Sequence, residues 1–211
     1  MVYPIQRLIV PPLLKLIWIK EIKGVENIPS DGRFIATPNH QSYFDDWLMP
    51  TVVVWRLNKK LHMYVTRKFY KNFLSRLYLN HCECIPVETG DAPDKKKVNE
   101  DAFNQGRDYL ARGEPMCIYP EGTRSKDGKL QQGKFGAAKL AIAEKVPILP
   151  IGISGTREVL PKGKSLPRLR KVIKINIGKP VFLDNFYGKE DKQSLKEATD
   201  YIMKEIEKAM N

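Results

Sequence analysis

Short apolar stretches alternate with amphipathic ones from Arg33 to about Ile177, and this alternation limits the folds open to the chain. The apolar stretches have the length and β-rich composition of buried strands, and they lie at Arg33–Pro38, Leu61–Thr66, Cys82–Val87, Met116–Tyr119 and Pro147–Ile153. Helices are predicted between them at Asp46–Leu57, Phe69–Leu79, Lys97–Ala111 and Lys134–Glu144. This order indicates an α/β fold, in which helices flank a mixed, mostly parallel β-sheet.

The rest of the chain fits the same architecture. Residues 172–177 form another β-rich stretch, and Leu195, Ile202 and Ile206 follow at the spacing of one buried helical stripe. A chain of 211 residues suits one domain with a sizeable core. We therefore expect a single domain over residues 21–211, preceded by a separate segment at residues 1–20.

Residues 1–20 combine apolar side chains with scattered cations. Only seven uncharged residues separate Arg7 from Lys15, whereas a helix that spans a membrane needs about 20 apolar ones. Pro11 and Pro12 are expected to break or restart a helix, and the layout of a signal peptide is missing. The pattern predicts an amphipathic segment that lies in a membrane interface through Leu13, Leu14, Leu16, Ile17 and Trp18. A helix packed on the protein's own core is the alternative.

The charge of the chain is strongly basic. Lys and Arg number 36 against 24 Asp and Glu, which gives a formal net charge of +12. Such a charge favours anionic partners, namely membranes, nucleic acids or phosphorylated substrates. No zinc-finger or RNA-recognition signature accompanies the basic clusters. We therefore expect an anionic membrane surface as the partner, and no nucleic acid.

The cysteines are few and odd in number. Cys82, Cys84 and Cys117 lack the density of a disulfide framework and favour a reducing compartment. Cys82 and Cys84 lie beside His81, but no second pair of metal ligands occurs in the sequence. No metal site is expected.

A first polar motif follows the strand predicted at Arg33–Pro38. It reads Asn-His-Gln-Ser-Tyr-Phe-Asp-Asp over residues 39–46, at the sheet edge where α/β proteins usually form their sites. His40 is a candidate general base, because a neutral imidazole accepts a proton from an alcohol. Asp45 lies five residues on and is placed to hold the other ring nitrogen. Taken alone, a histidine near two aspartates also suits a helix cap or a surface cluster.

A second polar motif, Tyr-Pro-Glu-Gly-Thr-Arg-Ser at residues 119–125, follows the strand predicted at Met116–Tyr119. Gly122 permits an unusual backbone angle, and Arg124 carries a planar guanidinium suited to phosphate oxygens. Lys126 and Lys134 add positive charge nearby. An exposed turn has a similar composition, so this motif alone does not decide the function.

The two motifs together resemble those of the His-x4-Asp glycerolipid acyltransferases. Asn39-His40-x4-Asp45 is followed by Glu121-Gly122-Thr123-Arg124, in the family's order. The resemblance extends to Lys23–Pro29, to Lys134-x-Gly136-Ala137 and to Val146–Ile151, so it covers the chain from Lys23 to Thr156. The most similar subgroup is that of the 1-acylglycerol-3-phosphate (lysophosphatidic acid) acyltransferases.

The resemblance implies a role for each matching residue. His40 is expected to be the general base and Asp45 the residue that orients it. Glu121, Gly122, Thr123 and Arg124 match the motif that binds the glycerol-phosphate group of the acceptor, with Arg124 as the main phosphate ligand. Arg67 falls where the family has a basic residue after a strand, and Lys134 is a further source of positive charge for the phosphate.

The resemblance also implies a fold like that of glycerol-3-phosphate acyltransferase and a reaction in phospholipid synthesis. The acyl group of a thioester, either acyl-CoA or acyl carrier protein, would pass to 1-acylglycerol-3-phosphate and give phosphatidic acid. No metal or redox cofactor is expected. The protein is expected at the cytoplasmic face of a membrane, bound peripherally or monotopically.

One departure from the family affects the acceptor. The family's second motif commonly ends in arginine, but Ile85-Pro86-Val87-Glu88 leads here to Thr89. A phosphate contact is therefore missing or comes from Arg67, Lys68 or Lys134. Another lysophospholipid or glycerol-phosphate acceptor stays open for this reason.

Two other classes of function stay open. A Ser-His-Asp hydrolase would need Gly-x-Ser-x-Gly, and the similar stretch at residues 152–156 ends in Thr156 instead of glycine. A non-catalytic basic protein that binds lipid or nucleic acid would also account for the charge. The presence of both His40 and Asp45 favours an enzyme.

Overall fold

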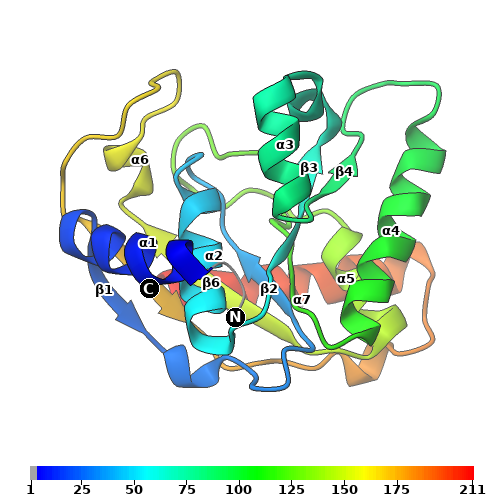
Figure 1. Ribbon diagram of the computed structural model, residues 1–211. Helices are drawn as coiled ribbons and strands as arrows, with labels where there is room; N and C mark the ends of the chain where they lie inside the picture. Colours follow the sequence, from blue (N-terminus) through cyan, green and yellow to red (C-terminus); the bar gives the residue numbers. More distant parts are fainter. Residues whose placement is uncertain (1–3) are drawn as a thin grey trace.

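The computed structural model describes residues 4–211, with side chains from residue 8 onward. Within this part of the chain, seven strands form one sheet in the order β1-β7-β6-β2-β5-β3-β4 (Figure 1). Their bounds are β1 Ile19–Lys23, β2 Ile35–Pro38, β3 His62–Thr66, β4 Ile85–Val87, β5 Met116–Cys117, β6 Ile148–Ser154 and β7 Ile173–Ile177.

The sheet is mixed and mostly parallel, as predicted. Strands β6, β2, β5, β3 and β4 run in one direction, each parallel to its neighbour. Strand β7 is antiparallel to β6, and β1 is parallel to β7. The carboxyl ends of five neighbouring strands therefore lie along one edge of the sheet, where side chains from distant motifs meet.

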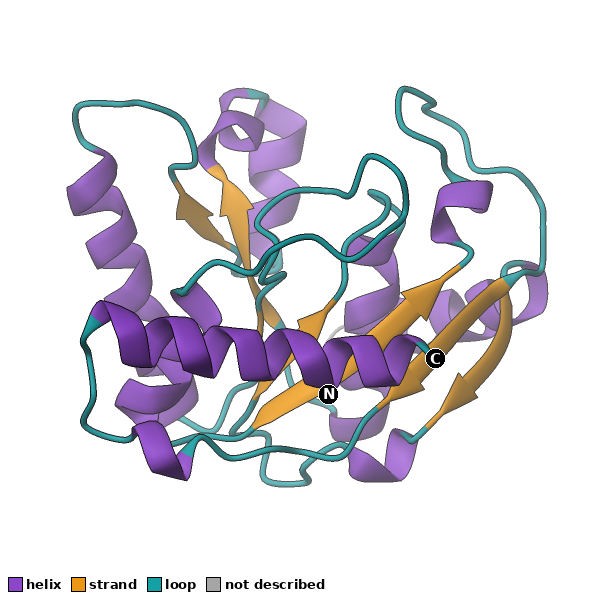
Figure 2. Ribbon diagram, turned by 180° about the vertical axis from the view of Figure 1, so that it is seen from behind, coloured by secondary structure: helices purple, strands orange, loops and turns teal. Residues whose placement is uncertain are grey.

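Helices cover both faces of the sheet. On one face lie α1 (Pro4–Ile17) and α2 (Asp45–Leu57), which pack against each other. The other face carries α4 (Lys95–Ala111), α5 (Gly136–Glu144) and α7 (Lys192–Met210), and Figure 2 shows α7 lying across it. The short helix α3 (Phe73–His81) follows β3 beyond the edge of the sheet, and α6 (Thr156–Val159) follows β6.

Strand residues alternate between the two faces. Phe34 and Ala36 are buried in the cluster under α1 and α2, whereas Ile35 is buried in the cluster under α4, α5 and α7. Gly152 of β6 allows α7 to approach closely, because a Cβ atom there would lie 2.2 Å from the carbonyl oxygen of Ala209. A period of two between apolar faces is what a strand covered on both sides requires.

The structure corrects the expectation for the first 20 residues. Helix α1 continues through Pro11 and Pro12 instead of breaking there, because Pro11 and Leu14 are buried and the helix packs along α2. Strand β1 was not predicted, and it begins at Ile19, so the boundary expected at residue 20 falls inside a strand. Residues 1–3 of the expected docking segment lie outside the described residues.

Helices long and apolar enough to cross a bilayer are absent from residues 4–211.

Candidate active site

The two polar motifs meet at the carboxyl edge of the sheet. β2 and β5 are parallel neighbours, so the segments that follow them emerge side by side. The backbone N–H of His40 donates to Oε1 of Glu121 over 2.7 Å, and the N–H of Ser125 donates to the carbonyl of His40 over 2.8 Å. A hydrogen bond from backbone to side chain thereby joins residues 81 positions apart in sequence.

Asn39 fixes the backbone immediately before His40. Its side-chain amide donates to the carbonyl of Ile153 over 3.0 Å and accepts from the N–H of Ile153 over 2.6 Å. Asn39 is buried, and the pair of hydrogen bonds ties the end of β2 to the end of β6. This amide replaces the ladder hydrogen bonds that stop at the strand end.

His40 and Asp45 form a buried pair. Nδ1 of His40 lies 2.9 Å from Oδ2 of Asp45, and the Asp45 side chain is fully buried. Oδ2 also accepts the backbone N–H groups of Gln41 and Ser42, over 2.7 and 2.8 Å. An ionised carboxylate only accepts hydrogen bonds, so the proton of the neutral ring sits on Nδ1. Nε2 then carries the lone pair that a base needs.

The ring of His40 is held flat against Tyr119. The ring centroids are 4.0 Å apart with an interplanar angle of 22°. The side chain of His40 retains 12% exposure, and within residues 4–211 its Nε2 has no hydrogen-bond partner. The second ring nitrogen is thus accessible to an incoming hydroxyl.

Glu121 holds its loop together through both carboxylate oxygens. Oε2 accepts the backbone N–H of Gln131 over 2.9 Å, while Oε1 accepts that of His40. Burial raises the pKa of Glu121, and the two backbone N–H donors oppose that shift. Gly122 has φ +64°, and a Cβ there would meet the Lys134 side chain at 2.8 Å, so this turn favours glycine.

Two of the cations predicted to bind phosphate, Arg124 and Lys134, lie around the loop of the second motif. The guanidinium carbon of Arg124 is 3.4 Å from the centroid of the Tyr43 ring, so the second motif covers a residue of the first. Lys134 lies against Gly122, and both Lys134 and Thr123 are exposed. These positions group Gly122, Thr123, Arg124 and Lys134 around the loop that carries Glu121.

Arg67 is placed differently from the expectation. It forms ion pairs with Glu88, at 3.1 Å, and with Asp94, at 2.5 Å. Arg67 and Thr89 both line a separate cavity of about 390 Å³ beyond the ends of β3 and β4. Two carboxylates already neutralise this guanidinium, so it is a weaker candidate than Arg124 for the acceptor phosphate.

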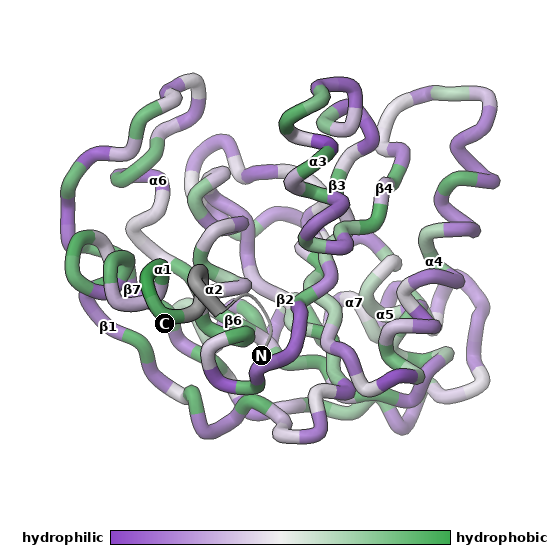
Figure 3. The backbone as a smooth tube through the Cα atoms, in the orientation of Figure 1, coloured by the Kyte–Doolittle hydropathy of each residue, from purple (hydrophilic) through white to green (hydrophobic). Residues whose placement is uncertain are grey.

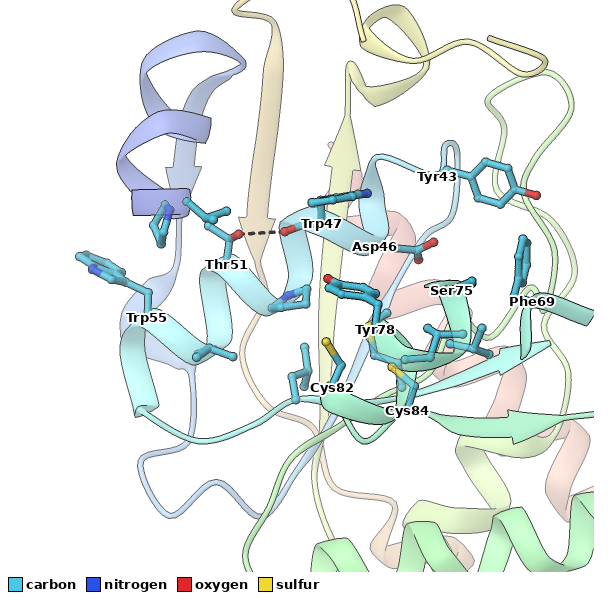
Figure 4. Close-up of a pocket in the computed structure, with 18 residues that line it drawn as sticks. Tyr43, Asp46, Trp47, Thr51, Trp55, Phe69, Ser75, Tyr78, Cys82 and Cys84 are labelled. Atoms are coloured by element: carbon cyan, nitrogen blue, oxygen red, sulfur yellow. Dashed lines mark hydrogen bonds between the residues drawn. The ribbon is translucent and has the colours of Figure 1, made fainter. Parts of the chain in front are cut away.

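An apolar groove begins beside the His40 motif. Its cavity of about 340 Å³ runs along α2 from Tyr43 and Asp46 to Trp55, and α3 forms the opposite wall (Figure 4). Trp47 of α2 and Tyr78 of α3 stack across it with centroids 6.2 Å apart. This groove was not predicted, because the residues facing one another across it are far apart in sequence.

The membrane-docking residues predicted in the first helix divide between two faces. Leu13 and Leu16 are 45% and 71% exposed. Leu14 is buried, and Trp18 packs on Phe44 and donates its indole N–H to the carbonyl of Arg168 over 2.8 Å. Ile17 is half-buried. Leu14 therefore belongs to the protein's own packing, which corrects the expectation at that position, whereas Trp18, like Ile17, is only partly buried.

Comparison with known families decides what this arrangement is. The family model described as "Acyltransferase" matches residues 20–154, which include both motifs and the whole of helices α2 and α3. The chain belongs to the acyltransferase family.

Similar proteins agree with this assignment. A chloroplastic 1-acyl-sn-glycerol-3-phosphate acyltransferase of Brassica napus is 27% identical over 77% of this chain. A 1-acyl-sn-glycerol-3-phosphate acyltransferase of Chlamydomonas reinhardtii is 31% identical over 68% of the chain. The chain spans less than half the length of these relatives, 45% and 41%. A taffazin of Dictyostelium discoideum is 27% identical over 82% of the chain and 64% of its own length.

The fold has a solved counterpart. The 1-acyl-sn-glycerophosphate acyltransferase PlsC of Thermotoga maritima superposes with a TM-score of 0.68 and 23% identity, over 96% of this chain and 80% of that one. The predicted α/β class, with a mostly parallel sheet between helices, is confirmed.

The acyltransferase groove also contains acidic and thiol groups. Burial raises the pKa of Asp46 to about 6, against the opposing effect of His40. Burial also raises the pKa of Cys84, which lines the groove, to about 12. Outside the groove, it raises the pKa of the buried Cys117 well above its ordinary value. Because only a thiolate is an effective nucleophile, neither thiol is suited to carry an acyl group at neutral pH.

Among residues 4–211, one group of side chains has the spacing of a metal site. Ligand atoms of His62, Glu83 and Glu114 lie within 4.8 Å of one another, at the opposite edge of the sheet from His40. Lys60 forms an ion pair with Glu83, and the two ring nitrogens of His62 lie against acceptor oxygens, the carbonyl of Glu83 and the carboxylate of Glu114. These side chains contact one another at the amino edge of the sheet and lie away from the His40 site.

Proposed function

We propose that this chain transfers a fatty acyl group from a thioester to the free hydroxyl of 1-acylglycerol-3-phosphate, which gives phosphatidic acid. The observation that carries the proposal is the His40–Asp45 pair, whose loop continues directly into Tyr43 and Asp46 at one end of an apolar groove. A base beside a channel for a hydrocarbon chain suits acylation of a lipid hydroxyl. The names of the Brassica and Chlamydomonas relatives support the choice of acceptor.

The reaction follows from the geometry of the pair. Nε2 of His40 takes the proton of the acceptor hydroxyl, and the oxygen attacks the thioester carbonyl. Asp45, held by Nδ1–H and two backbone N–H groups, stabilises the imidazolium that forms. When the tetrahedral oxyanion collapses, the carbon–sulfur bond breaks and the thiolate takes the proton back from Nε2. No covalent enzyme intermediate is needed, because the thioester is already activated.

The other residues position the two substrates. Glu121 and Asn39 hold the backbone of His40, and Tyr119 holds its ring. Arg124 lies beside Tyr43 at the start of the groove, where its guanidinium edge is suited to the acceptor phosphate. The groove takes an acyl chain, and its end near Asp46 is the end next to His40.

Acceptor specificity is tested by offering labelled palmitoyl-CoA with one of three acceptors. These are lysophosphatidic acid, glycerol 3-phosphate and lysophosphatidylcholine, and the products are separated by chromatography. We expect phosphatidic acid as the main product. A preference for lysophosphatidylcholine, or for glycerol 3-phosphate, would replace the proposed acceptor while leaving acyl transfer intact.

The role of Arg124 is tested by Arg124→Ala, with Lys126→Ala as the matched control from the same loop. Loss of a charge-assisted hydrogen bond to phosphate is expected to raise the KM for lysophosphatidic acid by about 10- to 100-fold. Lys126 is exposed and is expected to change it little. An unchanged KM in Arg124→Ala would remove this residue from the phosphate site.

A further inference from the structure

Helix α3 exposes an apolar face to solvent. Phe73, Leu74 and Leu77 are 66%, 72% and 60% exposed, and their spacing places them on one side of the helix. The inner side of α3 carries Ser75 and Leu79, which line the groove. A soluble surface helix normally shows the reverse pattern, with polar residues outward.

Helix α1 exposes a similar face on the other side of the groove. Leu8, Ile9 and Leu16 are 70%, 57% and 71% exposed, while Val10 and Pro11 line the groove. Between the two helices, α2 exposes Trp47 and Trp55, at 57% and 44%. Figure 3 shows hydrophobic segments on both α1 and α3. The mouth of the groove is thus bordered on two sides by exposed apolar side chains, a surface that we call the groove rim.

The charges around the groove rim are positive. Residues 68–82 contain Lys68, Lys71 and Arg76 but no Asp or Glu. Arg76 lies 5.9 Å from the Phe73 ring, and Lys15 of α1 lies 3.8 Å from the Trp55 ring. Helix α1, residues 4–17, also contains no acidic residue. Cations that surround an apolar face are the pattern of a helix lying in an anionic lipid interface.

We infer that α3 is a second membrane-docking element, which acts with α1 to seat the groove mouth on an anionic phospholipid bilayer. Aromatic side chains at the rim suit the headgroup level, and the Leu side chains of both helices suit the acyl boundary below it. The backbone of each helix is already hydrogen-bonded, so only side chains need to enter the lipid. A hydrocarbon chain then passes between bilayer and groove without crossing water. This last step rests on the proposed function, whereas docking does not.

The test compares the double variant Leu74→Ser/Leu77→Ser with the wild type. Neither residue lines the groove, and both are exposed, so the fold is expected to persist in thermal unfolding. The full chain is sedimented with vesicles of phosphatidylcholine and phosphatidylglycerol in equal parts. We expect the affinity for vesicles to fall about tenfold or more, and activity on detergent-dispersed lysophosphatidic acid to be retained.

A control variant tests whether loss of any exposed apolar side chain lowers the affinity for vesicles. Phe182 is 54% exposed and lies next to Val181, which pairs with the first residue of β6 at the edge away from His40. Phe182→Ser removes an exposed apolar side chain of similar size and is expected to leave vesicle affinity unchanged. Trp47 and Trp55 provide a second readout, because vesicles should shift the indole emission to shorter wavelength in the wild type and less in the double variant.

Three results would overturn the inference. These are a wild type that does not bind the vesicles, a double variant that binds as tightly as the wild type, and a control variant that loses as much affinity. If α3 instead mediates contact between two copies of the chain, sedimentation equilibrium will show a wild-type dimer that the double variant dissociates, with vesicle affinity unchanged. Failure of the acceptor assignment would alter none of the vesicle results, so the two proposals are separable.

Discussion

Two histidines at opposite edges of the sheet show what makes an imidazole available as a base. His40 follows β2 at the carboxyl edge, and His62 begins β3 at the amino edge. Each has a ring nitrogen on a carboxylate, at 2.9 Å for Asp45 and 2.8 Å for Glu114. Each also stacks on a tyrosine, with centroids 4.0 and 3.5 Å apart. By composition the two clusters are nearly the same.

The difference lies in the second ring nitrogen. Nδ1 of His62 is closed off by the carbonyl oxygen of Glu83 at 3.1 Å, and the side chain is fully buried. The His40 side chain keeps 12% exposure, and its Nε2 has no hydrogen-bond partner among the described residues. A histidine–carboxylate pair is therefore a structural link when both nitrogens are enclosed. It is a candidate base when one nitrogen is accessible next to a substrate channel.

The largest effect is expected from His40→Ala. A positioned base contributes about 10²–10⁴-fold to the rate, so acceptor-dependent thiol release should fall by that factor. The side chain is near the surface of the site, and thermal unfolding should change little. Substantial remaining activity in a folded variant would show that His40 is not the base.

Asp45→Asn should come next, with a loss of about 10²–10³-fold in kcat. Asparagine can still accept the N–H groups of Gln41 and Ser42, but it cannot stabilise an imidazolium and no longer fixes the proton on Nδ1. Steady-state kinetics measure the change in kcat. If Asp45 only supports the fold, kcat per folded molecule will be normal and only the unfolding midpoint will fall.

His62→Phe should lower the stability and leave kcat unchanged, the reverse of the effects expected for His40→Ala and Asp45→Asn. The variant leaves the carbonyl of Glu83 and the carboxylate of Glu114 without their ring partner, which should cost about 1–3 kcal/mol of unfolding free energy. Turnover per folded molecule should match the wild type. Denaturant unfolding measures the stability, and steady-state kinetics at a known concentration of folded protein measure the turnover. A lowered kcat with unchanged stability would contradict the comparison.

The smallest effect is expected in the pH dependence of stability. Burial lowers the pKa of His62, against the opposing effects of Glu83 and Glu114, so the folded ring binds its proton less readily than the unfolded one. The contribution of the neutral His62 ring to the unfolding free energy is full above the unfolded-state pKa of about 6.5, and it is lost as the pH falls below that value. The pKa of Asp46, raised by burial to about 6, has the opposite effect over a similar range.

The difference between the wild-type and His62→Phe stability curves isolates His62, because Asp46 is present in both proteins. That difference should decrease as pH falls from about 6.5. Glu114→Gln removes a group that raises the pKa of His62, so the pKa of the folded ring should fall further. The loss of unfolding free energy with falling pH should therefore continue to lower pH in this variant. A difference in unfolding free energy that does not change with pH would mean that His62 has the same pKa in the folded and unfolded states.

The sequence predicts one of these clusters better than the other for a physical reason. His40 and Asp45 are five residues apart, and Asp45 meets the backbone of the same turn, so the pair is local. His62 meets a carboxylate 52 residues away, and its role depends on the pairing of β3 with β5. The alternation of strands and helices fixes which edge of the sheet each motif reaches, and this part of the fold was predictable.

Other features depend on packing that no local pattern reports. Helix α1 passes through two prolines because it packs along α2, and β1 is found only by its pairing with β7, about 150 residues later. Tyr119 was seen as part of a motif, but its position against the His40 ring is a property of the β2–β5 register. The groove between α2 and α3 also depends on tertiary packing, so the sequence does not show that these two helices face each other.

The central claim is that His40 activates the acceptor hydroxyl directly, without an acylated protein. The measurement that tests it mixes the full chain with radiolabelled palmitoyl-CoA, first without acceptor and then with lysophosphatidic acid. Thiol release and protein-bound label are followed together. We expect neither thiol release nor labelled protein until the acceptor is added, and then thiol release matched by labelled phosphatidic acid. A burst of thiol without acceptor, with label on a cysteine such as Cys82, would contradict it.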